Sequence, residues 1–123
     1  MMKDFLPGGG HYSAGRRIGN LVFTAGQVPR DAERAVIGAT IEEQTEATLR
    51  NVEQVLSSFG ASMQDIVKAT VHLQSLTDVP GFNAAYAKFF PDVKPVRTVV
   101  GSALNGVLVE IDVVAALPEG GAK

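Results

Sequence analysis

The sequence predicts an α+β fold in which two helices cover one face of a β-sheet. Along the 123 residues the elements follow the order β-β-α-β-α-β-β, so two helical segments accompany four or five strands. Two helices are too few to cover both faces of such a sheet. Both are therefore expected on the same face, in a single domain over residues 1–123. Residues 120–123 are expected to fray.

The N-terminal part predicts a β-hairpin followed by a loop. Residues 21–25 are a short β-rich run that ends at Gly26, and residues 14–18 precede them across the turn-forming pair Gly19-Asn20. Residues 29–38 are polar and predict a loop.

The first helix is predicted to begin after Thr40. Thr40 and Glu43 have the spacing of a capping box, in which each side chain accepts a hydrogen bond from an otherwise free backbone N–H. Apolar side chains then recur every three or four residues over positions 41–59, which gives one buried stripe. Gly60 predicts a left-handed helix end.

The remaining predicted elements are a strand, a helix and two further strands. Residues 67–73 alternate between apolar and polar side chains, which is the period of a strand with one buried face. Asp78 is the predicted cap of a helix that ends before Phe90. Residues 96–100 and 107–115 predict the last two strands. The helical side chains expected to face inward are Phe82, Ala85, Tyr86 and Phe89.

The composition excludes several kinds of chemistry. The chain has no cysteine, which excludes disulfides, thiolate zinc sites and a cysteine nucleophile, and its two histidines are few for a metal centre. We therefore expect neither a metal nor a cofactor. A net charge of −2 with scattered basic residues argues against nucleic acid as the partner. Without a leader segment or an apolar run of about 18 residues, we expect a cytoplasmic protein with no membrane partner.

The sheet face without helices predicts contact with other subunits. It would carry Thr70 and His72 from one strand and, depending on the parity of the last strand, either an acidic or an apolar set. Such a mixed surface suits burial against copies of the same chain, so we expect an oligomer. The two alternative sets are Glu110 with Asp112, and Val109 with Ile111 and Val113.

Two charged residues inside apolar strands are candidates for chemistry. Arg97 cannot lose its proton, so in a buried strand it needs an anion, either a substrate carboxylate or a structural ion pair; an edge position in water is the other alternative. Glu110 interrupts the last strand, and Asp112 shares its face. A carboxylate near Arg97 would stay ionised and could accept a proton from an attacking water, whereas the simpler alternative is a structural pair or a solvated strand face.

The other polar residues carry weaker signals. His11 and Tyr12 follow three glycines and could rim a site or belong to a mobile N-terminal segment. His72 is expected to make a hydrogen bond at the surface or at a subunit interface. The stretch Gly8-Gly9-Gly10 lacks the strand, helix and lysine of a phosphate loop.

Several short motifs together resemble the Rid superfamily of reactive-intermediate deaminases, also called YjgF-like proteins. The N-terminal resemblance consists of Tyr12-Ser13 and the run Gly-Asn-Leu-Val-Phe-Thr-Ala-Gly-Gln-Val-Pro at residues 19–29. The resemblance covers about residues 12–117. Further matches follow in the family's order and spacing at residues 41–45, 51–52, 60–62, 65–68, 83–86, 89–91, 95–98 and 109–111.

The resemblance implies a fold, an assembly and an activity. The implied fold is chorismate-mutase-like, with two helices on one face of a mixed sheet, assembled as a homotrimer with three sites in the clefts between subunits. Members of the deaminase branch hydrolyse 2-aminoacrylate, 2-iminopropanoate, 2-iminobutanoate and related imines or enamines to 2-keto acids and ammonia. They need no cofactor.

The same resemblance implies roles for individual residues. Arg97 matches the arginine that binds the substrate carboxylate, and Glu110 matches the glutamate that positions or activates water. Asp112 gains no role from the comparison. The residues that match the lining of the pocket are Tyr12, Ala25, Gly26, Asn83 and Val99.

The chain also departs from the family pattern. Ala25 stands where many deaminases have a serine, Val99 where some have a cysteine, Gly101 where an acidic residue is common, and His11 where proline usually precedes the tyrosine. A hydroxyl lost at position 25 removes one hydrogen bond, worth about 0.5–1.5 kcal/mol. Activity could therefore survive with a shifted substrate preference.

Three other functions are weighed against a general imine deaminase. The trimer could bind or sense a small carboxylate without turnover, with Arg97 as the clamp. It could be a specialised catabolic deaminase, for example one acting on an aminomuconate-like intermediate. A third reading is ribonuclease activity or inhibition of translation, which the pI near 5.6 and the lack of a basic stripe argue against.

Overall fold

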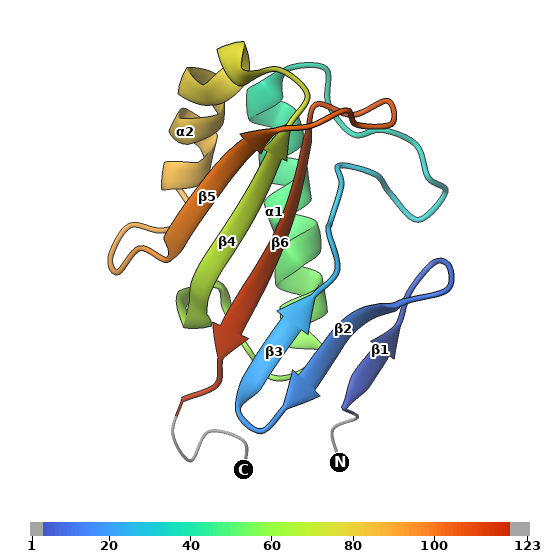
Figure 1. Cartoon of the computed structure of the whole chain (residues 1–123), viewed down its shortest axis with the longest axis vertical. Helices are drawn as coiled ribbons and strands as arrows, with labels where there is room; N and C mark the ends of the chain where they lie inside the picture. The colour runs from blue at the N-terminus through green and yellow to red at the C-terminus, as the bar shows by residue number, and fades with distance from the viewer. Residues whose placement is uncertain (1–3, 119–123) are drawn as a thin grey trace.

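The computed structural model describes residues 4–118, which form one six-stranded sheet with two helices on one face (Figure 1). The tail at residues 120–123, predicted to fray, lies outside the described residues. The strands are β1 (Phe5–Pro7), β2 (Ser13–Ile18), β3 (Leu21–Thr24), β4 (Ile66–Leu73), β5 (Val96–Gly101) and β6 (Val109–Ala116). The helices are α1 (Ile41–Ser57) and α2 (Val79–Ala87), with short 3-10 turns at Met63–Asp65 and Leu76–Asp78.

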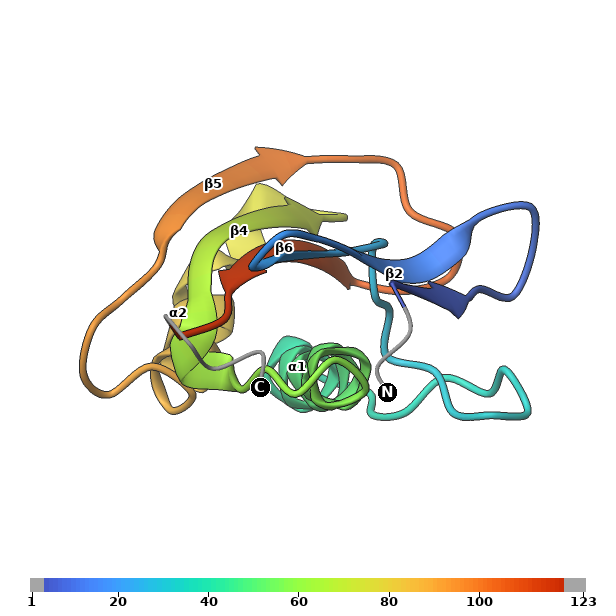
Figure 2. The ribbon, with the colours of Figure 1, turned by 90° about the horizontal axis from the view of Figure 1, so that it is seen from below.

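The sheet is mixed and has the strand order β1-β2-β3-β6-β4-β5. Only β4 and β5 pair in parallel, whereas the other neighbours are antiparallel. Figure 2 shows both helices beneath the same face, so the predicted α+β arrangement is confirmed. The sheet has one strand more than predicted. At three residues ending in proline, β1 is too short to show a strand period and forms by pairing with β2.

The core lies between α1, α2 and the covered face of the sheet. The central strands β4 and β6 contribute the side chains of Val71, Leu73 and Ile111, all fully buried. Gly15 in β2 lets the end of α1 approach, because a Cβ there would lie 2.8 Å from the ring of Phe59.

The first helix begins and ends where the sequence predicts. The Thr40 hydroxyl accepts a hydrogen bond from the Glu43 N–H at 3.1 Å, and the Glu43 carboxylate accepts one from the Thr40 N–H at 3.2 Å. Gly60 has a φ of +79°, which confirms the left-handed residue after the helix.

One side chain predicted to face the core of β4 is exposed instead. Val67 is 46% exposed, and Ile66 takes the core position before it. The pairing with β6 shifts by one residue between Ile66 and Lys68, which is a β-bulge at Val67. The predicted alternation holds from Ala69 onward.

The second helix begins after Asp78 and ends before Phe90, as predicted, but side chains near both ends differ from the prediction. Asp78 makes no side-chain cap bond, whereas the Ser75 hydroxyl accepts from Thr77 N–H in the preceding 3-10 turn. At the other end, Phe90 enters the core and Phe89 is only half-buried. The chain after α2 makes hydrogen bonds to the third residue back, and this tighter turn advances each side chain by more than an α-helix does.

The last strand shows which of its two sets of side chains faces the helices, a choice that the sequence left open. Val109, Ile111 and Val113 are buried against the helices. Glu110 and Asp112 therefore lie on the uncovered face, opposite His72 and Thr70 of β4.

Candidate functional site

Arg97 lies on the edge strand β5, exposed but turned toward the helix side of the sheet. Its guanidinium carbon lies 5.0 Å from the centre of the Tyr86 ring and 5.5 Å from that of Phe82. No ion pair joins Arg97 to an acidic residue within residues 4–118. Of the alternatives left open by the sequence, the structure supports the edge position, because β5 has a neighbouring strand on one side only.

The two rings form a platform beneath the guanidinium. A cation over an aromatic face is attracted by the ring quadrupole, which limits the orientations of the long side chain. Burial raises the pKa of the Tyr86 hydroxyl and the charge of Arg97 opposes that rise, so Tyr86 stays protonated near neutral pH. Its oxygen is buried with no hydrogen-bond partner among the described residues.

The sequence indicates part of this platform, although it predicts only a core role for the two rings. Phe82 and Tyr86 are four residues apart, one turn of a helix, and their ring centres lie 5.2 Å apart. That spacing puts both rings on one helical face. Only the pairing of β5 with β4 shows that Arg97 reaches the same face.

A cavity of about 340 Å³ opens beside Arg97. Arg97, Lys94 and Asn83 are its polar lining residues, and no acidic residue lines it. Two cations and an amide over apolar walls suit a small organic anion. The remaining lining residues are Tyr86, Ala87, Phe90 and Pro95.

Glu110 lies on the uncovered face of the sheet, with its carboxylate against the backbone of Gly26. A Cβ at position 26 would lie 2.9 Å from the carboxyl carbon of Glu110 and would overlap one of its oxygens. Gln27 and Ile111 exchange two backbone hydrogen bonds of 2.8 and 3.0 Å, which hold this segment beside β6. Gly26 therefore leaves the space in which the Glu110 side chain lies.

Further polar side chains surround Glu110 on the uncovered face. His72 is its cross-strand neighbour and shares a 2.7 Å hydrogen bond with the Ser102 hydroxyl. Burial raises the pKa of the Asp112 carboxyl, and the nearby charges of His72 and Lys68 partly offset that rise.

The ring of Tyr12 packs against the backbone of the glycines before it. A Cβ at Gly8 would lie 2.6 Å from the Tyr12 ring, and one at Gly10 would lie 3.2 Å from it. Gly8 N–H also donates to the Tyr12 carbonyl at 3.1 Å, and Tyr12 N–H donates to the Gly10 carbonyl at 2.9 Å. Gly8 and Gly10, which match no sequence motif, thus leave room for this ring. His11 beside it is exposed.

The structure separates the candidate residues into two groups. Arg97 and Val99 lie on the helix side of β5, and Asn83 of α2 shares the cavity with Arg97. Glu110 contacts Gly26, which follows Ala25 and shares a second cavity, of about 200 Å³, with Tyr12.

Arg97 and Glu110 do not meet within one chain. Arg97 is in register with Ala69 and Val113, whereas Glu110 is in register with His72, three residues farther along β4. The two side chains also project from opposite faces of the sheet. The expectation that a carboxylate lies near Arg97 is therefore not met inside the described chain.

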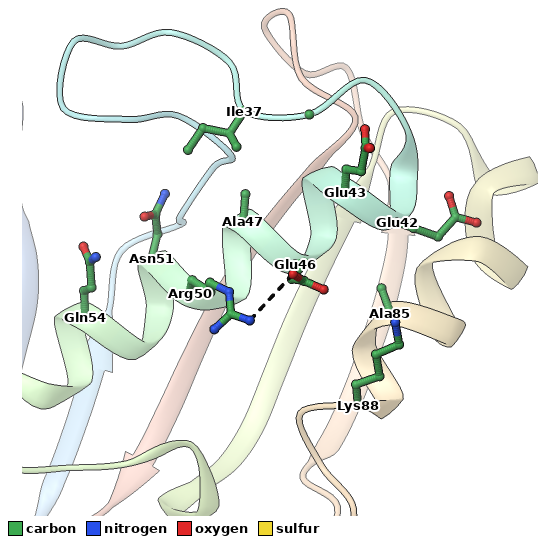
Figure 3. Close-up of a pocket in the computed structure, with 11 residues that line it drawn as sticks. Ile37, Glu42, Glu43, Glu46, Ala47, Arg50, Asn51, Gln54, Ala85 and Lys88 are labelled. Carbon is green, nitrogen blue, oxygen red and sulfur yellow. Dashed lines mark ion pairs between the residues drawn. The ribbon is translucent and has the colours of Figure 1, made fainter.

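A larger cavity of about 710 Å³ lies elsewhere, on the outer side of α1 (Figure 3). Two of its three acidic side chains already have partners: Glu43 belongs to the helix cap, and Glu46 lies 3.6 Å from Arg50. None of the predicted site residues lines this cavity.

Residues 4–118 contain neither a metal-binding cluster nor a membrane-spanning helix. That range holds no group of three or more acidic or histidine side chains placed to bind a metal ion. None of its helices combines the length and the apolar surface needed to cross a membrane.

Comparison with known proteins places the chain in a family. The family model described as "Endoribonuclease L-PSP" matches residues 3–117. A RutC family protein of Pyrococcus abyssi is 37% identical over 109 residues, which are 86% of each chain. The fold and these matches show that this chain belongs to the YjgF family, within the Rid superfamily, as its motifs indicated.

Two solved structures show the same fold. The YjgF gene product of E. coli has a TM-score of 0.83 and 31% identity, covering 92% of this chain and 93% of its own. E. coli TdcF, solved with bound serine, has a TM-score of 0.82 and 32% identity, covering 93% of this chain and 94% of its own.

Proposed function

We propose that this chain is a hydrolytic deaminase of reactive enamines and imines of the 2-aminoacrylate type, working in the cytoplasm as a homotrimer. One observation carries the proposal: Arg97 is held over two aromatic rings, at an open cavity, with no acidic partner among residues 4–118. A guanidinium held this way keeps its donors available for a ligand carboxylate. Membership of the Rid superfamily supports the same reading.

The carboxylate of the substrate binds Arg97 in this proposal. Its planar fork offers two parallel N–H donors, which match the two oxygens of a carboxylate and fix the plane of the bound molecule. Asn83 lines the same cavity and can bind a further polar atom. Phe82 and Tyr86 position the guanidinium, and Tyr86 also lines the cavity.

Glu110 completes the site from a neighbouring subunit. Since one chain directs Arg97 and Glu110 to opposite faces of its sheet, a site containing both requires two chains. Glu110 lies on the face without helices, which is the face expected to meet another subunit. Gly26 and Tyr12 would enter the site together with Glu110.

The reaction adds water to a C=N bond and then breaks the C–N bond. An enamine such as 2-aminoacrylate first becomes the imine by gaining a proton on carbon and losing one from nitrogen. The oxygen of a water held by Glu110 then attacks the imine carbon, and a proton from that water passes to the carboxylate. The resulting carbinolamine loses ammonia once its nitrogen is protonated, and the product is a 2-keto acid.

Fixing the substrate beside the water supplies most of the acceleration. Imines of this kind already hydrolyse in water, so a modest reduction of the barrier is enough, and each 1.4 kcal/mol or so gives about a tenfold increase in rate. Ala25 replaces the serine of many deaminases, and Val99 replaces the cysteine of some. These two differences alter the walls of the pocket but leave Arg97 and Glu110 in place.

The proposal is tested by following ammonia release from 2-aminoacrylate generated by a serine dehydratase. We expect the protein to accelerate decay of the intermediate. Arg97→Ala should lose most of this acceleration, since a charge-assisted contact is worth about 1.5–3 kcal/mol, and Arg97→Lys should recover little of it. The expected fold and assembly of both variants match those of the wild type.

Arg50→Ala is the matched control for this experiment. Arg50 also lies over an aromatic ring, 5.6 Å from the centre of Phe89, but outside the proposed site. It should keep the wild-type rate. An Arg97→Ala protein as active as the wild type, or one that unfolds, would contradict the assignment.

A second candidate function is binding without turnover. The relative TdcF was solved with bound serine, which favours small-molecule binding in this family. In that case calorimetry would detect a carboxylate ligand that depends on Arg97, while ammonia release would match the uncatalysed rate.

A further inference from the structure

Arg34 has an unusual backbone conformation. Its φ is +71°, and within residues 4–118 no other residue except glycine has a positive φ. Residues with a Cβ adopt this left-handed region at a free-energy cost, and such strained residues cluster at functional sites. Arg34 is therefore a candidate for a functional role.

Hydrogen bonds hold the backbone on both sides of Arg34. Arg34 N–H donates to the Asp31 carbonyl, and the Asp31 carboxylate accepts from the N–H groups of Glu33 and Ala35. The Arg34 carbonyl accepts a 2.7 Å bond from the guanidinium of Arg30, which also binds the Asn105 carbonyl. The guanidinium of Arg30 therefore stabilises the loop. The guanidinium of Arg34 is the one available to a ligand.

The side chain of Arg34 and the hydroxyl of Tyr12 lie on the same side of the glycine segment. Both lie close to one point beside Gly9: a Cβ built there would be 3.8 Å from a terminal nitrogen of Arg34 and 3.6 Å from the Tyr12 oxygen. The two residues line one cavity of about 200 Å³ with Gly26, whose other neighbour is Glu110. No ion pair of Arg34 occurs among residues 4–118.

We infer that Arg34 and the Tyr12 hydroxyl form a second carboxylate-binding subsite, so that the preferred substrates are imines or enamines with two carboxylates. This inference rests on the proposed function, which places Tyr12 and Gly26 in the substrate pocket. Arg97 would hold the carboxylate next to the C=N bond, and Arg34 would hold the distal one.

The chemistry of the subsite fits a carboxylate better than a neutral group. A guanidinium beside a phenol offers several donors, and a carboxylate oxygen can accept from both at once. Asp31 also lines this cavity, but one of its oxygens is already bound to two backbone N–H groups. The substrates indicated are the imines formed by oxidation of acidic amino acids such as aspartate.

The test compares two imines produced in place by amino-acid oxidases, one from aspartate and one from alanine. The variants are Arg34→Asn and Arg34→Gly, since both residues tolerate a positive φ and remove the charge without adding strain. For the aspartate imine we expect kcat/KM to fall about ten- to 100-fold, the range for a lost charge-assisted contact. For the alanine imine the change should stay within about twofold, as for other surface substitutions.

The outcomes separate the subsite from the proposed function. If the wild type and both variants hydrolyse the alanine imine but keep the same ratio between the two substrates, the subsite is wrong and the deaminase proposal stands. An equal fall for both substrates also overturns the subsite, because Arg34 would then act on their shared part. If the wild type accelerates neither imine, the deaminase proposal itself fails, and the subsite fails with it.

Discussion

At the scale of single residues, glycines determine where the functional side chains can lie. Gly26 leaves room for the Glu110 carboxylate, and Gly8 and Gly10 leave room for the Tyr12 ring. Each of these glycines lies so close to the side chain it accommodates that a methyl group would force a shift. The substitution of such a glycine therefore tests a site residue without changing that residue itself.

Gly26→Ala is expected to disable the site while leaving the fold intact. The added methyl would overlap the carboxylate of Glu110, whose side chain can rotate away toward the open face of the sheet. A displacement of about 1 Å at a reacting group costs roughly 100-fold in rate. We expect kcat for imine hydrolysis to fall by about that factor, with little change in the thermal midpoint measured by circular dichroism.

Gly101→Ala serves as the control for this substitution. A Cβ at Gly101 would meet Leu76 at 3.4 Å, which is ordinary van der Waals contact. This variant should keep the wild-type rate. Wild-type kcat in Gly26→Ala would show that the place of Glu110 against Gly26 has no part in catalysis.

The sequence alone identifies some of the candidate site residues but not others. Arg97 and Glu110 stand out because each is a charge in an apolar strand, a local signal. Arg34 gives no such signal in a polar loop, and only its backbone conformation and the cavity it shares with Tyr12 single it out. Whether Arg97 and Glu110 meet depends on strand register, which their spacing in the sequence does not determine.

At the scale of elements, the start of α1 depends on one carboxylate. Glu43 accepts hydrogen bonds from the N–H groups of Ala39 and Thr40, and these bonds lower the pKa of its carboxyl group. A lowered pKa in the folded state stabilises the fold at every pH above the ordinary value for glutamate. This stabilisation disappears as the pH falls through the lowered pKa.

Glu43→Gln is therefore expected to lower the free energy of unfolding at pH 7 but not in strong acid. Urea unfolding at a series of pH values should show the gap between wild type and variant closing as Glu43 becomes protonated. Glu42→Gln, in the same first turn but outside the capping box, controls for the loss of a negative charge at the helix start. A gap that stays constant down to the acid limit would contradict the role of the ionised carboxylate.

Helices and strands can be predicted from the sequence where the residues that define them lie close together in the chain. The capping box at Thr40, the apolar stripe of α1 and the alternation in β4 each depend on residues close in sequence. The misses depend on pairing with distant segments: β1 forms because β2 lies beside it, and the bulge at Val67 arises from its register with β6. The place of β5 at the sheet edge is likewise a property of topology.

At the scale of the whole molecule, the face without helices exposes large apolar side chains as well as polar ones. Ile18 is 60% exposed and Phe23 is 40% exposed there, next to the polar group of Glu110, Asp112 and His72. Large exposed apolar surface of this kind marks an interaction site, and a cyclic trimer would bury it. Such burial would also bring Glu110 toward a neighbouring chain.

The most direct test of a site shared between subunits mixes two inactive variants, Arg97→Ala and Glu110→Gln, under conditions in which the subunits exchange. Each variant alone should form inactive homotrimers. If Arg97 and Glu110 act from different chains, random mixing restores about one quarter of the sites, because a trimer interface can then join the two intact residues. Recovery of imine hydrolysis to about that fraction is the predicted result. No recovery, in mixtures whose exchange is verified by native mass spectrometry, would contradict the shared site.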